Sequence, residues 1–341
     1  MTKAINVAAS NAGPYAHVHP DFREVLLASD EARLAFLDEP RWIGYQRAQL
    51  ALDTLQALMN KPRQPRMRNL LIVGDSNNGK TTLIQRFKHL CGEAYVDENA
   101  DSIKPVIVAE APPSADEKGM YISILERFWA PYRASSPPAQ LRYQVVHMLR
   151  RCKVKILIID EFHSLLTGSA AKQREVMNAI KLLCNEVGIP IVGAGTRDAV
   201  RVLHTDPQHA SRFDVLPLPL WSLDPEFQKL LAGIERVLPL RKPSLLAAPE
   251  TATTIHAISG GNLGDAYRLL NECAKQAITK GTEQITDEHL RSMAWLRPTK
   301  GVREMALCVS RGPYACLCCL ASCSRPGCRG LRWCKAAIPS C

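Results

Sequence analysis

Short apolar runs alternate with segments of helical periodicity over the first two thirds of the chain. The runs are rich in Val, Ile and Leu and lie at 69–73, 105–110, 154–160, 189–196 and 213–220. Continuous apolar runs of this length are typical of buried parallel strands, and apolar residues three or four apart between them predict helices. The last run contains two prolines, which an edge strand tolerates. The pattern predicts an α/β fold, a parallel sheet with helices on both faces.

One strand-to-helix junction carries the motif G-x-x-x-x-G-K-[ST], from Gly74 to Thr81. The two glycines let the backbone turn, so that N–H groups of the loop and of the next helix face a phosphate. Lys80 is expected to reach the β- and γ-phosphates, and the Thr81 hydroxyl to ligate Mg²⁺. The sequence therefore predicts a nucleoside triphosphate site built from Gly74, Asp75, Ser76, Asn77, Asn78, Gly79, Lys80, Thr81 and Thr82.

Two acidic residues, Asp160 and Glu161, stand at the end of the apolar run 154–160. Parallel sheets bind their ligands at the carboxyl ends of the strands. A phosphate-loop enzyme needs an acid there to hold Mg²⁺, which is the role expected of Asp160. Glu161 is then placed to polarise the attacking water. The alternative for either residue is a solvated charge at a strand end.

Three further polar residues each allow two interpretations. Thr196 ends the run 189–196 and either orients water near the γ-phosphate or caps the helix that follows. Arg212 faces away from its own site, and it either reaches the γ-phosphate of a neighbouring subunit as an arginine finger or is a surface residue. Arg268 either leans over the nucleotide or is an exposed helical residue.

The alternation of strands and helices ends near Trp221, and helical patterns follow to residue 297. We therefore predict four segments. They are an N-terminal arm with helices (1–60), an α/β nucleotide-binding domain (61–222), a small all-helical lid domain (223–297) and a disordered tail (298–341).

Charge and cysteine are concentrated in the tail. The chain has a net charge of +10, but residues 298–341 hold seven basic residues and one acid, which leaves +4 for the rest. The overall charge is therefore weak evidence for nucleic-acid binding by the folded part. Because no apolar run is long enough for a membrane span and no signal-peptide pattern opens the chain, we predict a cytoplasmic protein without a membrane partner.

Eight of the twelve cysteines lie between Cys308 and Cys341. Cys316 and Cys319 have the spacing of zinc ligands, but no second matching pair follows them. The tail is interpreted as a disordered or accidental extension, with a zinc site as the alternative.

The features described so far, together with an Arg-Phe pair at 212–213 and a Gly-Gly turn in the helical part, resemble the AAA+ ATPases. Within them the chain resembles TniB and TnsC, ATP-dependent regulators of DNA transposition that are related in role to MuB. The resemblance covers about residues 20–297. Its sharpest parts are the segments 74–81, 159–163 and 193–197.

This resemblance implies further roles. Thr196 takes the sensor-1 position and Arg212 that of the arginine finger. The segment Trp42-Ile-Gly-Tyr45 lies where such proteins contact adenine, so Ile43 and Tyr45 join the expected ATP site; from the residues alone the segment is equally a hydrophobic staple at a helix start. Related ATPases often carry the sensor-2 arginine where this chain has Gly264, and Arg268 stands one helical turn later. Hydrolysis is therefore expected to be slow or to depend on a partner.

The resemblance also implies a biological activity. ATP-bound subunits would assemble into a ring or helical filament on double-stranded target DNA, recruit and activate the transposase, and disassemble on hydrolysis. A target-selection protein is a further candidate partner.

Three other classes of protein share some of these sequence features. An AAA+ helicase or initiator loader of DNA replication would share every motif and differ in its partner. An ATP-gated scaffold would turn over negligibly. A DExH helicase matches Asp160-Glu-Phe-His163, but it requires a second α/β motor domain, and only helical patterns follow residue 221.

Overall fold

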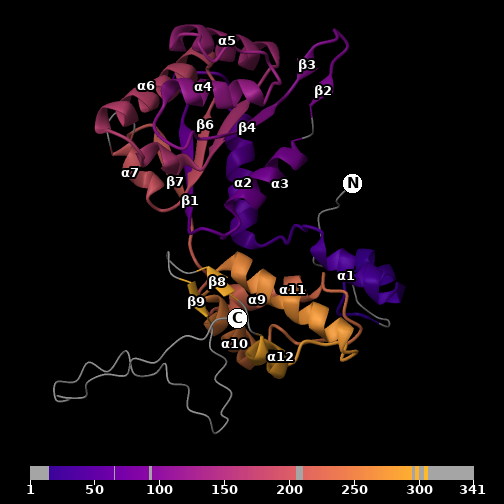
Figure 1. Cartoon of the computed structure of the whole chain (residues 1–341). Helices are drawn as coiled ribbons and strands as arrows, with labels where there is room; N and C mark the ends of the chain where they lie inside the picture. Colours follow the sequence, from indigo (N-terminus) through magenta and orange to yellow (C-terminus); the bar gives the residue numbers. More distant parts are fainter. Residues whose placement is uncertain are drawn as a thin grey trace, which may run out of the picture. The chain divides into compact units, whose positions relative to one another are not determined.

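The structure is a computed structural model that describes residues 15–64, 66–91, 94–204, 210–293, 296–298 and 303–305. Its five-stranded parallel sheet has the strand order β4-β5-β6-β1-β7. Figure 1 shows this sheet among the helices α2 to α7, with α9 to α12 in a separate group. The strands are β1 (Asn69–Gly74), β4 (Val106–Glu110), β5 (Ile156–Asp160), β6 (Ile191–Gly195) and β7 (Phe213–Leu218). β7 lies at one edge of the sheet, as its prolines predict.

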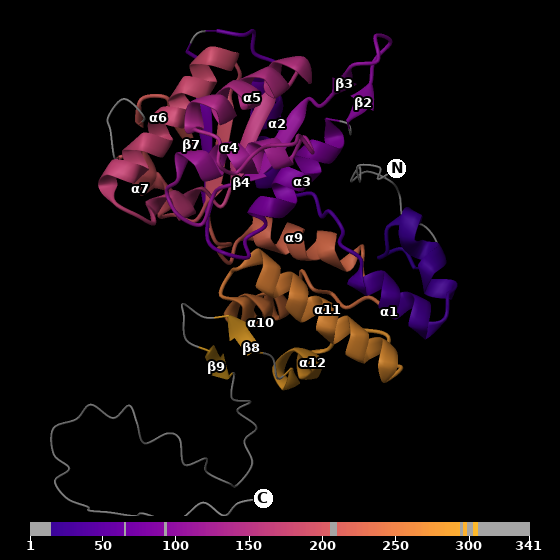
Figure 2. The same cartoon turned by 45° about the horizontal axis from the view of Figure 1, so that its top comes forward.

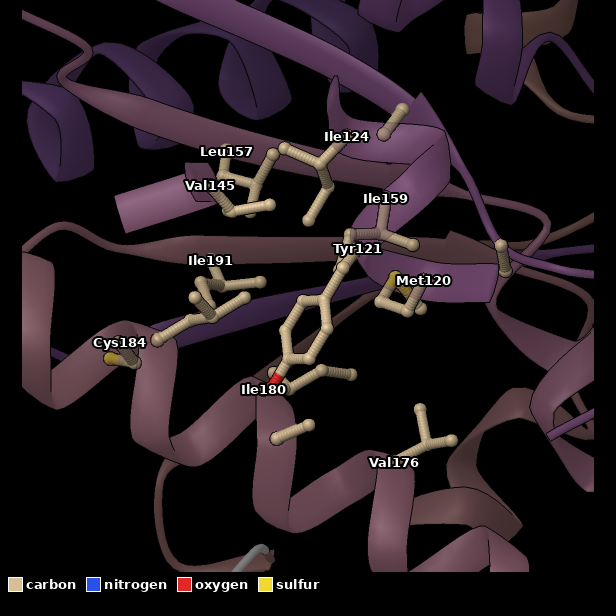
Figure 3. Packing of buried hydrophobic residues seen from close by; sticks show 14 of the residues in the cluster. Met120, Tyr121, Ile124, Val145, Leu157, Ile159, Val176, Ile180, Cys184 and Ile191 are labelled. Carbon is tan, nitrogen blue, oxygen red and sulfur yellow. The ribbon is translucent and has the colours of Figure 1, made fainter. Parts of the chain in front are cut away.

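Alternate residues of β1 enter two hydrophobic cores, one on each face of the sheet. Leu71 and Val73 pack with the helices α4 (Glu117–Glu126), α5 (Pro138–Arg151), α6 (Ala170–Val187) and α7 (Ala199–Leu203). Leu70 and Ile72 pack with α2 (Gln46–Met59) and α3 (Lys80–Leu90). Figure 3 shows the first core, where Tyr121 of α4 lies among side chains of β5 and α6. The predicted parallel sheet with helices on both faces is therefore confirmed.

The region after the sheet is helical, with α9 (Pro225–Glu235), α10 (Pro249–Ser259), α11 (Leu263–Thr279) and α12 (Asp287–Ser292). We call residues 225–292 the lid. The short 3₁₀ helix η1 (Pro20–Leu27) and α1 (Asp30–Asp38) pack against it, and Figure 2 shows α1 beside α11. The His19 amide donates to the Arg236 carbonyl at 2.8 Å, and Lys275 pairs with Asp38 at 2.6 Å.

A buried arginine strengthens this junction. The Arg33 side chain is fully buried and donates to the Pro239 carbonyl, to Asp30 and to both carboxylate oxygens of Glu283. Arg241 also pairs with Glu283, at 3.1 Å, and its Nε donates to the Leu26 carbonyl. The N-terminal helices η1 and α1 are thus joined to the lid, whereas α2 belongs to the sheet.

Two segments differ from the sequence-based expectation. The helical pattern after the second apolar run continues from Lys118 to Tyr132 in the sequence, but α4 ends at Glu126. Trp129 adopts a left-handed φ of 57°, and the Ala130 amide donates to the Leu125 carbonyl at 3.3 Å, which closes the end of the helix before Pro131. A small antiparallel hairpin, β2 (Tyr95–Val96) with β3 (Ser102–Ile103), was not expected, because two-residue strands give no periodicity.

The described residues up to Met293 form one compact unit, and the antiparallel pair β8 (Leu296–Pro298) and β9 (Arg303–Met305) belongs to a second. The tail cysteines and the expected zinc spacing lie outside the described residues. Among the residues described, no helix is long and apolar enough to cross a membrane. No cluster of three or more His, Cys, Asp or Glu side chains in this part of the chain could hold a metal ion.

Candidate functional site

The loop between β1 and α3 is shaped around Lys80. A Cβ atom at Gly74 would lie 2.8 Å from the Leu218 carbonyl oxygen of β7, and Gly79 caps α3 with a φ of +81°. Lys80 is 8% exposed, and its Nζ donates to the carbonyls of Gly74 at 3.0 Å and Asp75 at 2.8 Å. Burial lowers the pKa of Lys80, while the charges of Glu161, Asp160 and Asp75 oppose that shift. The ammonium therefore stands inside the loop, where a phosphate is expected.

The next residue joins the loop to the strand-end acid. Thr81 Oγ1 donates to Asp160 Oδ2 at 2.9 Å, and Asp160 Oδ1 accepts from the Glu161 amide at 2.9 Å. A hydroxyl and a carboxylate beside a phosphate site are the hard oxygen ligands that Mg²⁺ takes together with substrate phosphates and water. The two residues thus fit a magnesium ion.

Glu161 turns away from the strand in a left-handed conformation, with φ 54° and ψ 34°. This conformation is uncommon for a residue with a Cβ atom and often marks a functional site. The carboxylate is 46% exposed, and its Oε2 lies 3.2 Å from His163 Nδ1, an ion-pair distance when the ring is protonated. The histidine belongs to the segment 159–163, but no role could be predicted for it, because the left-handed turn that brings it to Glu161 has no signal in the sequence.

Thr196 follows β6, close to the same histidine. A Cβ atom at Gly195 would lie 3.1 Å from the His163 amide nitrogen. The Thr196 carbonyl accepts from the Ala199 amide at 2.9 Å, and Asp198, rather than Thr196, occupies the N-cap of α7. This geometry does not support the capping interpretation and leaves the sensor-1 role as the prediction for Thr196.

Other loop residues are held by their neighbours. Asn78 is 3% exposed, and its amide donates to the Leu218 carbonyl at 2.9 Å and the Pro219 carbonyl at 3.2 Å. The Asp75 carboxylate pairs with Arg197 at 2.7 Å, a contact that the sequence did not suggest. Thr82 is exposed on α3.

The segment expected to contact adenine runs between the lid and the phosphate loop. The Tyr45 ring meets that of Trp221 edge to face, with centroids 5.1 Å apart. The Tyr45 hydroxyl lies 4.0 Å from the position of a Cβ on Gly79, and Ile43 lies 3.6 Å from that of a Cβ on Gly233 of α9. Burial raises the pKa of Tyr45, against the opposing charge of Arg47. Tyr45 therefore borders the loop and packs on Trp221, whereas Ile43 lies against α9 of the lid.

The lid meets the phosphate loop at the start of α11. The Asn262 side chain donates to the Ser76 carbonyl at 2.9 Å, and the Gly264 amide donates to the Asn77 carbonyl at 3.0 Å. Arg268 is exposed one turn further along the helix. Asn262 and Gly264 thus join the lid to the loop through direct hydrogen bonds, and a nucleotide contact of Arg268 stays a prediction.

Arg212 directly precedes β7 and lies at the amino ends of the strands, whereas the phosphate loop lies at their carboxyl ends. The Arg212 carbonyl accepts from the amide of Asn69, the first residue of β1, at 2.9 Å, whereas the phosphate loop begins at Gly74, the last residue of β1. The guanidinium donates to Asn185 Oδ1 at 2.9 Å. The length of β1 therefore separates Arg212 from the phosphate loop of its own chain.

Comparison with protein families gives one match. The family described as bacterial TniB protein matches residues 33–223, which hold the phosphate loop, Asp160, Glu161, Thr196 and Arg212. No curated protein matches the chain.

Solved structures with a similar fold include the Aeropyrum pernix ORC2 protein in ADPNP and ADP complexes. It has a TM-score of 0.51 and 17% identity, covering 75% of this chain and 70% of that chain. CDC6P from Pyrobaculum aerophilum has a TM-score of 0.53 and 17% identity, with coverages of 75% and 69%. The Aeropyrum pernix ORC1 protein in complex with DNA has 0.51 and 18%, with 76% and 68%. At these identities the likeness shows the fold alone, that of the P-loop AAA+ proteins.

Proposed function

Because the chain belongs to the bacterial TniB family, we propose that it is an ATP-hydrolysing protein of DNA transposition. Its subunits bind ATP, assemble on double-stranded target DNA, and recruit and activate the transposase there. Hydrolysis then disassembles the oligomer and so controls which targets stay marked.

The proposed chemistry is the transfer of the γ-phosphoryl group of ATP to water. The loop amides and Lys80 bind the phosphates, with Ile43 and Tyr45 beside the base. Thr81 and Asp160 would hold Mg²⁺, which when bound neutralises charge on the phosphate oxygens. Glu161 orients and polarises the attacking water, and Thr196 at the neighbouring strand end helps to position it.

Arg212 is the expected arginine finger of the assembly. Since it lies at the opposite end of β1 from the loop, we assign it to the site of another subunit. A contact between the loop end of one subunit and the Arg212 end of the next is heterologous, and such contacts give rings or open helical filaments.

The single observation that carries the proposal is the hydrogen bond between Thr81 and Asp160, with Glu161 beside them. It brings the phosphate loop and the strand-end acids of the matched family region into one site. Its test is the rate of ATP hydrolysis with and without double-stranded DNA, for the wild type and for Glu161→Gln. We expect DNA to stimulate the wild type, and Glu161→Gln to bind ATP but lose at least about 100-fold in turnover. Wild-type turnover that stays at background with both DNA and the transposase present would refute the enzymatic part.

Assembly on DNA requires a separate test. Electron microscopy with a non-hydrolysable ATP analogue should show rings or filaments on duplex DNA, and none when ADP replaces the analogue. Monomers under both conditions would refute the transposition role. Stimulation of strand transfer by the purified transposase distinguishes this role from that of a replication loader, which would load a helicase and leave strand transfer unchanged.

A further inference from the structure

The first turn of α11 approaches the phosphate loop too closely for a side chain at position 264. A Cβ atom at Gly264 would lie 2.2 Å from Asn77 Oδ1 and 2.4 Å from the Asn77 carbonyl oxygen. The Gly264 amide uses this proximity and donates to that carbonyl at 3.0 Å. Because one of the two obstructing groups is backbone, rotation of the Asn77 side chain alone cannot make room. This packing therefore excludes an arginine at position 264.

Asn77 contacts the lid through its side chain as well. Its Nδ2 donates to Asp265 Oδ1 at 2.8 Å, across 188 residues of sequence. Asn77 has a φ of +60°, a left-handed conformation that asparagine adopts more readily than most residues. The loop thus presents both the carbonyl and the amide of one residue to α11.

Neighbouring residues extend the contact in both directions. Asn262 caps α11 by accepting from the amides of Gly264 and Asp265, while its own amide donates to the Ser76 carbonyl at 2.9 Å. The Leu263 amide lies 3.3 Å from Asn78 Oδ1, to which it donates. Residues 76–78 are therefore hydrogen-bonded to residues 262–265 one after another. A lid movement must break these bonds or move the loop with it.

We propose that Asp265 and Asn77 are positioning residues for ATP binding. Their hydrogen bond holds the phosphate loop in the shape in which Lys80 and the loop amides receive the phosphates. It also transmits a change in the loop to α11. Asp265 acts through Asn77 and does not itself contact the nucleotide. The inference rests on the ATP binding proposed above.

A simpler role for Asp265 has a different signature. An acidic residue in the first turn stabilises a helix through its charge. If that were its whole contribution, Asp265→Asn and Asp265→Ala would be alike, because both remove the charge. If the hydrogen bond to Asn77 matters, Asp265→Asn should behave as the wild type, because the asparagine oxygen still accepts from Asn77.

The test compares three variants of the full chain in the binding of a fluorescent ATP analogue. Asp265→Ala should raise the Kd roughly five- to tenfold, the loss expected for one hydrogen bond of ordinary strength. Asp265→Asn should stay within about twofold of the wild type. Glu250→Ala, which removes an acid from the first turn of α10, is the matched control and should also leave the Kd unchanged. Equal Kd values for Asp265→Ala and the wild type, or for Asp265→Ala and Asp265→Asn, would overturn the proposal.

Hydrogen exchange provides a second measurement, made on the wild type and then on Asp265→Ala. The analogue should slow exchange at residues 262–266 together with the phosphate loop, and this linked protection should disappear in Asp265→Ala. Protection of the loop without any at 262–266 in the wild type would also overturn the proposal. If the wild type binds no ATP at all, the proposed function itself fails, a result distinct from either of these. Circular dichroism confirms that each variant is folded.

Discussion

Thr81 and Asp160 lie 79 residues apart in sequence, but the Thr81 hydroxyl donates to Asp160 Oδ2 at 2.9 Å. Thr81 stands at the start of α3, directly after β1, and Asp160 ends β5, so both lie at the carboxyl ends of the parallel strands. Their two oxygens are the groups available to a magnesium ion at the phosphate loop. Glu161, the next residue, points its carboxylate to His163. Two adjacent acids thus have separate surroundings, which allows one to bind the metal and the other to act on water.

This separation predicts different phenotypes for the two acids. Asp160→Asn should raise the Mg²⁺ concentration that gives half-maximal ATP hydrolysis by about tenfold or more, since a neutral amide is a weaker ligand for a hard cation. Glu161→Gln should reduce the maximal rate and leave the affinity for Mg²⁺ near that of the wild type. A Mg²⁺ titration of ATP hydrolysis, with Mg²⁺-dependent nucleotide binding for the slow variant, measures both. Identical shifts in the two variants would contradict the assignment.

At this scale the sequence predicted the phosphate loop and the strand-end acids, because their spacing follows from the chemistry of phosphate and magnesium binding. The contacts of Asn77 with Gly264 and Asp265 could not be predicted, because no spacing in the sequence indicates which residues as far apart as Asn77 and Asp265, 188 positions, are in contact. The same holds for Trp221 beside Tyr45.

At the scale of the elements, the closest packing along β6 is at Gly193. A Cβ atom there would lie 2.8 Å from Leu71 Cδ1 of β1 and 2.9 Å from the Phe162 ring of η2 (Phe162–Leu166). The glycine therefore allows the central strands and the 3₁₀ helix after β5 to approach one another, next to Glu161.

Gly193→Ala should lower the free energy of unfolding by about 1–3 kcal/mol, the usual result of overpacking a core. Urea unfolding followed by circular dichroism measures it. Gly44→Ala is the matched control, because its nearest neighbour would be Trp42 Nε1 at 3.7 Å, an ordinary contact. Equal stability of the two variants would contradict the packing argument.

The elements that the sequence predicted best are those with many buried residues in a regular pattern, such as β1 and β5. The hairpin β2–β3 has strands of two residues with mostly exposed side chains, which leave no apolar pattern. The end of α4 depends on a local turn before Pro131, whereas apolar periodicity continues to Phe128 and so extended the predicted helix.

In the molecule as a whole, the N-terminal helices η1 and α1 are held to the lid by Arg33 and Glu283. Burial raises the pKa of Glu283, but the hydrogen bonds from Arg33 and the Arg241 amide and the charges of both arginines outweigh it, so the pKa is lowered overall. Two chain segments connect the sheet to the lid and the N-terminal helices joined to it. One lies between α1 and α2 and contains Tyr45, and the other lies between β7 and α9 and contains Trp221, whose ring packs on that of Tyr45.

Removing the Glu283 carboxylate would leave the buried Arg33 with only the exposed carboxylate of Asp30 as its counter-charge. Glu283→Gln should lower the free energy of unfolding by about 3 kcal/mol or more. Lys229→Ala, which breaks an exposed pair with Glu226 on α9, should change it by less than about 1 kcal/mol. Urea unfolding of both variants decides this, and comparable values would contradict the structural role of the pair.

The same pair predicts a dependence on pH. Since the pKa of Glu283 is lower in the folded chain than its ordinary value, its contribution to stability is fully present above that ordinary value. The contribution is lost as the pH falls through the lowered, folded-state pKa. The stability difference between wild type and Glu283→Gln should therefore shrink in acid, and a difference that grows below pH ~4 would contradict the sign.

Arg212 can be tested by mixing subunits. Arg212→Ala and Glu161→Gln should each hydrolyse ATP at least about tenfold more slowly than the wild type. In an equal mixture about a quarter of the shared sites would pair an intact Glu161 with an intact Arg212, so activity should return to that level. A mixture no more active than its two components would contradict a finger that acts between subunits.

Arg212 stands at the amino ends of the strands and the phosphate loop at their carboxyl ends, which has a consequence for any assembly that joins the two. Each contact between subunits uses one surface of each kind, so an open filament ends in an unmatched phosphate loop at one terminus and an unmatched arginine at the other. The two termini are chemically unlike. A protein that recognises only one of these surfaces would bind at one terminus alone, and the filament would have a direction along the DNA.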